Sequence, residues 1–175
     1  FNCLHCWRNF DYMLPRSRED WDEPTAILDG CINAQLNLLE GFHGNANVDR
    51  EKLTKSLEPK HVAISLSGEP TLYPYLPEFI DEILAHKMTA FLVSNGTNPE
   101  MIEKILDHQP TNLYISFYGT TPEMYKRTAV PMIKDFWPRV LQSLNMLGRF
   151  DCNTVVNSDY SRFFGIPLEI LGMLY

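Results

Sequence analysis

The chain has 175 residues, of which 45% are hydrophobic and 21% are charged. These values are typical of one soluble globular domain and exclude a disordered tail or a collagen-like chain. Fifteen Lys and Arg residues against 22 Asp and Glu residues give a net charge of −7. The average surface therefore does not attract phosphate, and any nucleic-acid site must be a local basic patch.

Four cysteines are too few and too irregularly spaced for the disulfide framework of a secreted domain. We therefore expect a reducing, cytoplasmic location. The weakly charged stretch 163–175 contains Pro167 and Glu169 and is shorter than the roughly 20 residues that span a bilayer, so we expect no membrane segment. The sequence starts at Phe1 without an initiator Met, and we expect it to be a fragment.

Helices and strands alternate along the sequence. Apolar residues at steps of three and four predict helices, and short apolar runs bounded by turn residues predict strands. The expected order is helix 25–39, helix 49–57, strand 61–66, helix 76–84, strand 90–93, helix 101–106, strand 113–117, helix 136–147 capped by Asp135, and strand 153–156. Four strands separated by helices predict an α/β fold with a parallel sheet in a single domain, either doubly wound or part of a barrel.

Small and polar residues follow three of these strands. They are Ser67-Gly68-Glu69-Pro70, Ser94-Asn95-Gly96-Thr97, and Ser116 with Tyr118-Gly119. The chemistry of α/β folds gathers at the carboxyl ends of the strands. We therefore predict the active edge of the sheet at these three loops, although Glu69 alone could be an ordinary turn carboxylate.

Cys3-Leu4-His5-Cys6 is the sharpest short motif, and several chemistries use two thiols at this spacing. A zinc site would need two more ligands, and Cys31 and Cys152 are isolated residues that we expect to be buried. A redox dithiol would open a helix, which the following residues do not favour. An iron–sulfur cluster and a purely structural pair remain open.

The cysteine loop followed by Trp7-Arg8, the strand that ends in Gly68-Glu69-Pro70, and the alternating α/β units together resemble the radical S-adenosylmethionine (SAM) superfamily. The resemblance implies a [4Fe-4S] cluster bound by Cys3 and Cys6, which match the second and third cysteines of the superfamily's loop. The first would lie two places before Phe1. It also implies SAM as a cofactor and a partial (βα)6 TIM-like barrel that is truncated at both ends.

Within this superfamily, the segments 58–74, 91–97, 113–116 and 131–137 resemble the family of tRNA 4-demethylwyosine synthases. The resemblance covers residues 1–156 as a radical SAM core and leaves 157–175 as a tail of unclear assignment. It implies a lyase of wybutosine biosynthesis that condenses pyruvate carbons with N1-methylguanosine in tRNA(Phe), after a 5′-deoxyadenosyl radical takes hydrogen from the methyl group. An electron donor is then a partner, and a second [4Fe-4S] cluster and a pyruvate-binding lysine are expected before Phe1.

The resemblance also implies roles for single residues. Those expected to bind SAM are Ser67, Gly68, Glu69, Pro70, Asn95, Ser116 and Trp7. A separate expectation comes from position, because three arginines flank the cysteine loop and two cations follow the strand that ends at Ser116. Together we expect them to form a phosphate-contacting rim, although each alone could belong to a solvated charged face; they are Arg8, Arg16, Arg18, Lys126 and Arg127. Two alternatives remain, namely another radical SAM enzyme such as an activase, which shares the cluster loop, and a non-catalytic zinc-binding α/β module.

Overall fold

The computed structural model describes residues 3, 20–66 and 68–158. Its sheet has four parallel strands in the order β1-β2-β3-β4, which are β1 (His61–Ile64), β2 (Thr89–Ser94), β3 (Asn112–Ser116) and β4 (Asn153–Asn157). The expected roles of Cys6, Trp7, Arg8, Arg16, Arg18, Ser67 and residues 159–175 lie outside the described residues.

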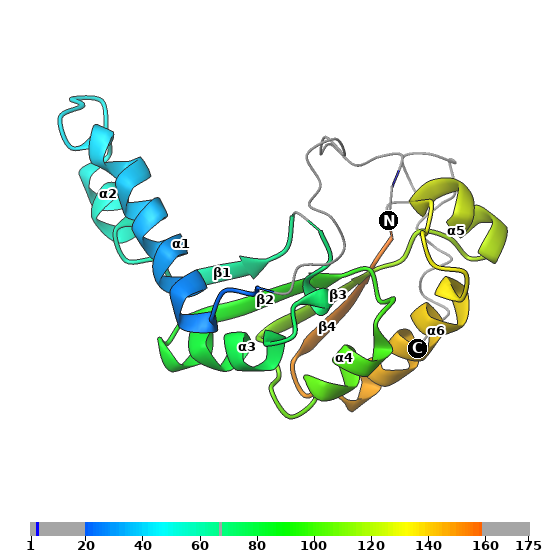
Figure 1. Ribbon diagram of the computed structural model, residues 1–175. Coiled ribbons are helices and arrows are strands. Elements are labelled where there is room, and N and C mark those ends of the chain that lie inside the picture. Colours follow the sequence, from blue (N-terminus) through cyan, green and yellow to red (C-terminus); the bar gives the residue numbers. More distant parts are fainter. Residues whose placement is uncertain (1–2, 4–19, 67, 159–175) are drawn as a thin grey trace.

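The strand order decides between the two α/β architectures that the sequence left open. Each strand pairs with the next strand along the chain, and the order does not reverse among the described strands. A doubly wound sheet needs such a reversal, whereas a barrel adds its strands one after another. Because α3, α4 and α6 all cover the same face of the sheet (Figure 1), the described strands form part of a barrel wall.

Six α-helices are described, and five of them match the prediction. They are α1 (Pro24–Leu39), α2 (Arg50–Ser56), α3 (Leu76–Ala85), α4 (Pro99–Lys104), α5 (Pro122–Ala129) and α6 (Phe136–Met146). Helix α5 was not predicted, although its start has a clear signal. The Thr121 side chain accepts a hydrogen bond from the Met124 amide at 3.2 Å, and Pro122 occupies the first turn.

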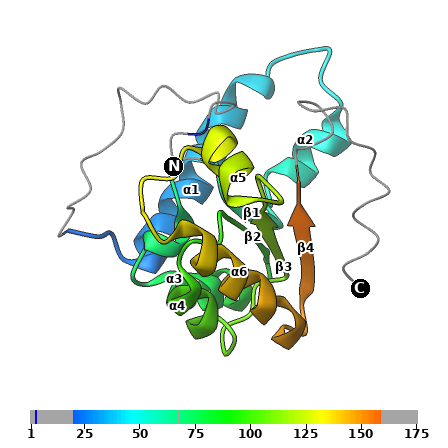
Figure 2. The same cartoon turned by 90° about the vertical axis from the view of Figure 1, so that its right-hand side faces the viewer.

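Two groups of apolar side chains hold the elements together. The larger group lies between the sheet and helices α1, α3 and α4, and it includes the fully buried Leu76, Ile80, Leu92 and Ile102. Tyr125, Ala129, Phe136 and Val140 form the smaller group, which joins α5 to α6. The smaller group lies toward the carboxyl ends of the strands, where Figure 2 shows α5 beyond the strand tips. The smaller group therefore supports the region at the carboxyl ends of the strands separately from the larger group.

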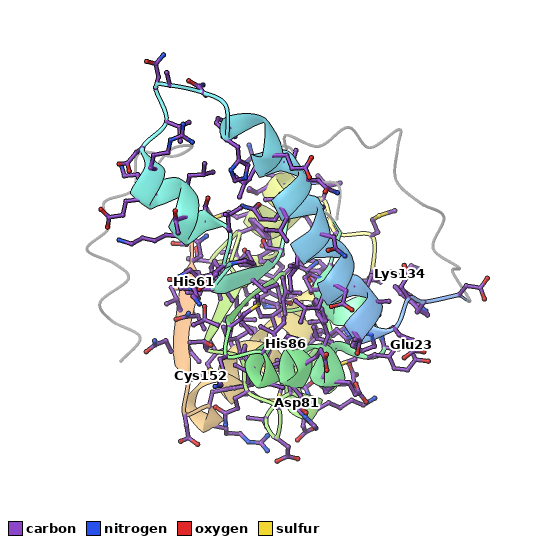
Figure 3. All side chains as sticks on the ribbon, turned by 90° about the vertical axis from the view of Figure 1, so that its left-hand side faces the viewer. Glu23, His61, Asp81, His86, Lys134 and Cys152 are labelled. Carbon is purple, nitrogen blue, oxygen red and sulfur yellow. The ribbon has the colours of Figure 1, made fainter. Side chains whose placement is uncertain are left out.

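Three details differ from the expectation. Cys31 is exposed on α1, whose buried face is narrow, so its predicted burial was wrong. Cys152 is half-buried next to the start of β4, on the side of the molecule opposite to Lys134 (Figure 3), and burial raises the pKa of its thiol. The Asp135 side chain does not cap α6; its carboxylate lies 3.8 Å from Arg139 Nη1 instead. No helix among the described residues is long and apolar enough to cross a membrane.

Candidate active site at the carboxyl ends of the strands

The register of the sheet brings the three predicted loops to one edge. Ile64 pairs with Leu92, Ser94 with Ile115, and Ser116 with Asn157, so consecutive strands end close to one another. The loops after β1, β2 and β3 therefore leave the sheet on the side where α5 lies (Figure 2). The structure thus confirms that the three loops lie at one edge of the sheet.

The carboxylate of Glu69 joins two of these loops. Its Oε1 accepts hydrogen bonds from Ser94 Oγ at 2.7 Å, from Thr71 Oγ1 at 2.7 Å and from the Thr71 amide at 3.2 Å. Its Oε2 accepts one hydrogen bond, from the Asn95 amide at 2.8 Å. Hydrogen bonds to an ionised acceptor are stronger than neutral ones, so this half-buried side chain connects the ends of β1 and β2 firmly. We call Glu69, Thr71, Ser94 and Asn95 the Glu69 network.

The turn that follows β2 is folded tightly. Ser94 Oγ accepts a hydrogen bond from the Gly96 amide at 3.0 Å, and Asn95 Oδ1 accepts hydrogen bonds from the amide and hydroxyl of Thr97 at 2.9 and 2.6 Å. Gly96 has a φ of +71°, and a Cβ atom there would lie 3.0 Å from Ile115 Cγ2. Both the backbone angle and the close approach require glycine at this position.

Helices α5 and α6 fix the same turn from the other side. The Tyr125 hydroxyl donates to the Asn95 carbonyl at 3.4 Å, Ser143 Oγ donates to the Gly96 carbonyl at 2.7 Å, and Arg139 Nε donates to the Thr97 carbonyl at 2.6 Å. Three consecutive carbonyl groups are thus bound by side chains from two helices. The turn is preorganised, because its donors and acceptors are satisfied by groups on rigid elements.

Arg139 also forms an ion pair that closes the outer end of this turn. Its Nη2 contacts Oε2 of Glu100, the second residue of α4. A backbone hydrogen bond at the helix start, together with the Arg139 guanidinium, holds the pKa of Glu100 below its ordinary value. The guanidinium therefore ties α6 to both the turn and the beginning of α4.

The loop after β1 has an unusual backbone. Leu66 and Gly68 have φ values of 87° and 79°, and Gly68 is exposed with open space where a Cβ would stand. Such angles persist only where the surrounding structure holds them, and they cluster at binding sites. Pro70 then begins a short 3-10 turn, Pro70–Leu72, in which the Glu69 carboxylate bonds to the Thr71 amide. Gly68 is thus exposed, while the half-buried Glu69 and Pro70 anchor the loop to the sheet.

Aromatic rings surround the end of β3. The Tyr125 ring stacks on Phe136 with centroids 5.4 Å apart. The rings of Phe117, Tyr118 and Trp137 pack around Tyr125 at centroid distances of 5.6 to 5.9 Å. Cys3 is half-buried and packs against this cluster. The described cysteine of the predicted cluster loop therefore lies beside α5 and α6. Within residues 3, 20–66 and 68–158, no three His, Cys, Asp or Glu side chains form a group able to hold a metal ion.

Three further predicted site residues, Ser116, Lys126 and Arg127, lie outside the Glu69 network. Ser116 is buried at the end of β3, and Lys126 and Arg127 are exposed on α5. The sequence did not predict Thr71, which donates to Glu69, or the three side chains from α5 and α6 that hold the β2 turn, which are Tyr125, Arg139 and Ser143. Ser143 had a usable signal, because it is a polar residue on the apolar face of α6, three positions after Val140. Tyr125 could be found only once α5 was recognised.

A model of the radical SAM superfamily matches residues 45–160, which is most of the chain and includes every described strand. The chain belongs to the radical SAM superfamily. As a superfamily member it has the partial barrel that the sequence predicted. The superfamily assignment also implies a [4Fe-4S] cluster and SAM as cofactors.

Several relatives share one function. The chain is 41% identical over 158 residues to the S-adenosyl-L-methionine-dependent tRNA 4-demethylwyosine synthase of Pyrococcus abyssi, covering 89% of this chain and 46% of that protein. It is 34% identical to the synthase of Saccharomyces cerevisiae, covering 83% of this chain and 18% of that protein. The chain thus spans about half the length of the archaeal relative and less of the yeast one.

Solved structures agree with the sequence relatives. The fold is similar to a structure of TYW1 with a lysine-pyruvate adduct bound, with a TM-score of 0.78 and 37% identity, over 90% of this chain and 50% of that one. It is also similar to the crystal structure of archaeal TYW1, with a TM-score of 0.72 and 34% identity, over 87% of this chain and 51% of that one.

Proposed function

We propose that this chain forms the SAM-binding core of a tRNA 4-demethylwyosine synthase that acts in the cytoplasm. The reaction would condense pyruvate carbons with N1-methylguanosine in tRNA(Phe) to form the 4-demethylwyosine tricycle, with electrons from a separate donor. The observation that carries this proposal is the 41% identity over 89% of the chain to a protein of that name. The lysine-pyruvate adduct in a similar structure supports pyruvate as a substrate.

The chemistry of the described residues fits SAM. SAM carries an ammonium group, which needs acceptors, and a carboxylate has about four lone-pair positions. Glu69 Oε2 accepts one hydrogen bond within the chain and keeps capacity for another. Gly68, with its exposed backbone and positive φ, leaves room for a ligand to approach the main chain. We propose that Gly68, Glu69 and Pro70, with Ser67, bind the amino-acid portion of SAM.

Asn95, Ser116 and Trp7 complete the proposed SAM site. Asn95 is held by the Glu69 network and Ser116 closes β3 one strand further along the sheet. The proposed ligands of the [4Fe-4S] cluster are Cys3 and Cys6, and a third thiolate, a second cluster and the pyruvate-binding lysine would come from outside this sequence. When bound, the cluster and SAM supply one-electron chemistry, and this chain orients SAM and shields it from water.

The proposed tRNA contact is a basic rim formed by Arg8, Arg16, Arg18, Lys126 and Arg127. Lys126 and Arg127 are exposed on α5, which lies on the same side of the sheet as the carboxyl ends of the strands. Phosphate groups are bound mainly by Lys and Arg, so a local cluster can act within an acidic protein. Bases in the anticodon loop are accessible to a concave site because they are single-stranded.

The product of the reaction tests this function. The whole gene product, reconstituted anaerobically with iron and sulfide, is incubated with tRNA(Phe) that contains N1-methylguanosine, SAM, a reductant and carbon-13 pyruvate. Mass spectrometry of the digested tRNA should detect the tricyclic nucleoside with pyruvate-derived label. The Cys3→Ala variant is the control, since it removes a proposed cluster ligand and should form no product. SAM cleavage without labelled tricycle would instead indicate a superfamily enzyme with another substrate.

A further inference from the structure

A solvent-open groove lies at the end of α5, next to the aromatic cluster and outside the Glu69 network. It has a volume of about 390 Å3, and its lining includes Lys126, Val130, Met132, Ile133, Lys134 and Phe136. This volume is within the range of sites that take small organic groups. Figure 3 shows the Lys134 side chain at the outer margin of the molecule.

The floor of the groove exposes apolar side chains in a cluster. Val130, Met132 and Ile133 are 37%, 51% and 40% exposed, and they fall within four consecutive positions. Single exposed apolar residues are common on protein surfaces, whereas contiguous ones mark an interaction surface. The groove therefore has a surface for the apolar face of a ligand.

The backbone at Val130 gives the groove its shape. Val130 has a φ of 43°, in the left-handed region, and its amide bonds to the Lys126 carbonyl at 3.2 Å. β-Branched residues rarely adopt this conformation. It ends α5 abruptly and turns residues 131–134 along the groove. A strained position of this kind is retained where the structure needs the conformation.

Two ammonium groups border the apolar floor. Lys126 Nζ lies 6.0 Å from the centre of the Phe136 ring, and neither Lys126 nor Lys134 forms an ion pair with the described residues. The carboxylate next in sequence, Asp135, is directed to Arg139 instead. Residues 122–135 carry three cations and two carboxylates, in a chain with a net charge of −7. The groove is thus locally positive on an acidic protein.

We propose that this groove binds one nucleotide of a single-stranded RNA segment, with its phosphate between Lys126 and Lys134 and its base or sugar on the apolar floor. A nucleotide combines an anion with a planar, largely apolar group, and the groove offers both partners side by side. The proposal rests on the proposed function, because the RNA would be the substrate tRNA. The groove would hold a nucleotide other than the modified one, since it lies outside the loops at the strand ends.

Charge-neutralising variants test the phosphate contact. In the whole gene product with its cluster, we compare Lys126→Gln/Lys134→Gln with Lys52→Gln/Lys104→Gln, which removes two exposed lysines on α2 and α4 and so changes the net charge equally. The affinities for tRNA(Phe) and for a single-stranded RNA oligonucleotide are measured against salt concentration. The groove variant should bind about tenfold more weakly, with a salt slope reduced by about 1.4, the value for two phosphate contacts on single-stranded RNA.

A third variant tests the apolar contact. Ile133→Ser should weaken RNA binding and leave the salt slope unchanged, because it removes no charge. The control variant should match the wild type in affinity and slope. All four proteins should have the same melting temperature, since the substituted side chains are exposed.

The outcomes separate this inference from the proposed function. If the wild type binds tRNA and the groove and control variants give parallel salt slopes, the RNA assignment is overturned, and an acidic protein segment becomes the better occupant. If the wild type does not bind tRNA but binds the oligonucleotide through Lys126 and Lys134, the groove is confirmed as an RNA-binding site and the synthase function fails. If it binds neither RNA, both proposals fail.

Discussion

Replacing Glu69 should lower both the free energy of unfolding and the affinity for SAM, and the two losses can be measured separately. In Glu69→Ala, four hydrogen-bond donors lose their acceptor, and three of them belong to the buried residues Thr71 and Ser94. A hydrogen bond to a charged group contributes about 1.5–3 kcal/mol, but water can reach the half-buried carboxylate site, so we expect a loss of about 3 kcal/mol in the free energy of unfolding. Glu78→Ala, an exposed glutamate on α3, is the matched control and should change little.

Two further variants separate the contributions of Glu69. Glu69→Gln keeps one oxygen acceptor but turns an NH2 group toward a donor, so it should lose less stability than Glu69→Ala. If Glu69 bonds the ammonium of SAM directly, both Glu69 variants should weaken SAM binding by about 1.5–3 kcal/mol, or roughly 10- to 150-fold. Ser94→Ala removes one donor to the carboxylate and the acceptor of the Gly96 amide, and it leaves the carboxylate in place. It should cost about 1–3 kcal/mol of stability and keep SAM affinity within about threefold.

Urea unfolding gives the stabilities, and anaerobic equilibrium dialysis of the reconstituted protein gives the SAM affinities. An unfolding free energy for Glu69→Ala within about 0.5 kcal/mol of the wild type would refute the structural role of the network, because that is the range of neutral surface substitutions. If Ser94→Ala lost as much SAM affinity as Glu69→Ala, Glu69 would act only by shaping the β2 turn.

Other predictions concern the turn and its surroundings. Gly96→Ala should destabilise the fold by about 2 kcal/mol or more in urea unfolding, and an unchanged midpoint would contradict the required positive φ. Arg139→Ala should cost about 1.5–3 kcal/mol, whereas Arg149→Ala, which breaks only an exposed ion pair, should cost less than about 1 kcal/mol. The pKa of Glu100 is lowered in the folded state, so its ionised form stabilises the fold. This stabilisation is present above the unfolded-state pKa and is lost as the pH falls through the folded-state pKa. Arg139→Ala should weaken this loss of stability in acid. Burial and nearby carboxylates raise the pKa of Tyr73 to about 12, so its stabilising effect should be present below its ordinary pKa of 10.0 and lost toward pH 12, which a phenolate absorbance titration against Tyr73→Phe can follow.

The sequence predicted the strands and most helices because their apolar residues follow clear periodicities, as in β2, where alternate residues are buried. It missed α5 because the buried residues of this helix, Tyr125 and Ala129, stand among polar residues and form no apolar stripe. Cys31 follows the helical period of the apolar residues in α1, but α1 buries only a narrow face and leaves Cys31 exposed. Periodicity shows which residues share a helix face and does not show how wide the buried part of that face is.

The sequence predicts where the candidate site lies but not the hydrogen bonds that hold it together. Parallel strands end at a common edge, so the polar residues after β1, β2 and β3 had to lie near one another. The partners of Glu69 were not predictable, because Ser94 and Asn95 are about one α/β unit away and their contacts depend on the exact turn geometry. Arg139 and Ser143 reach the turn from more than 40 residues along the chain. Such contacts leave no local pattern in the sequence.

The fate of the hydrogen removed from the tRNA tests the central claim most directly. The claim is that SAM bound at these strand ends reacts at the methyl group of N1-methylguanosine. The whole gene product is given tRNA(Phe) whose methyl group carries deuterium, and the 5′-deoxyadenosine formed from SAM is analysed by mass spectrometry. We predict deuterium in the 5′-deoxyadenosine of the wild type. Turnover that yields 5′-deoxyadenosine without deuterium would contradict the account.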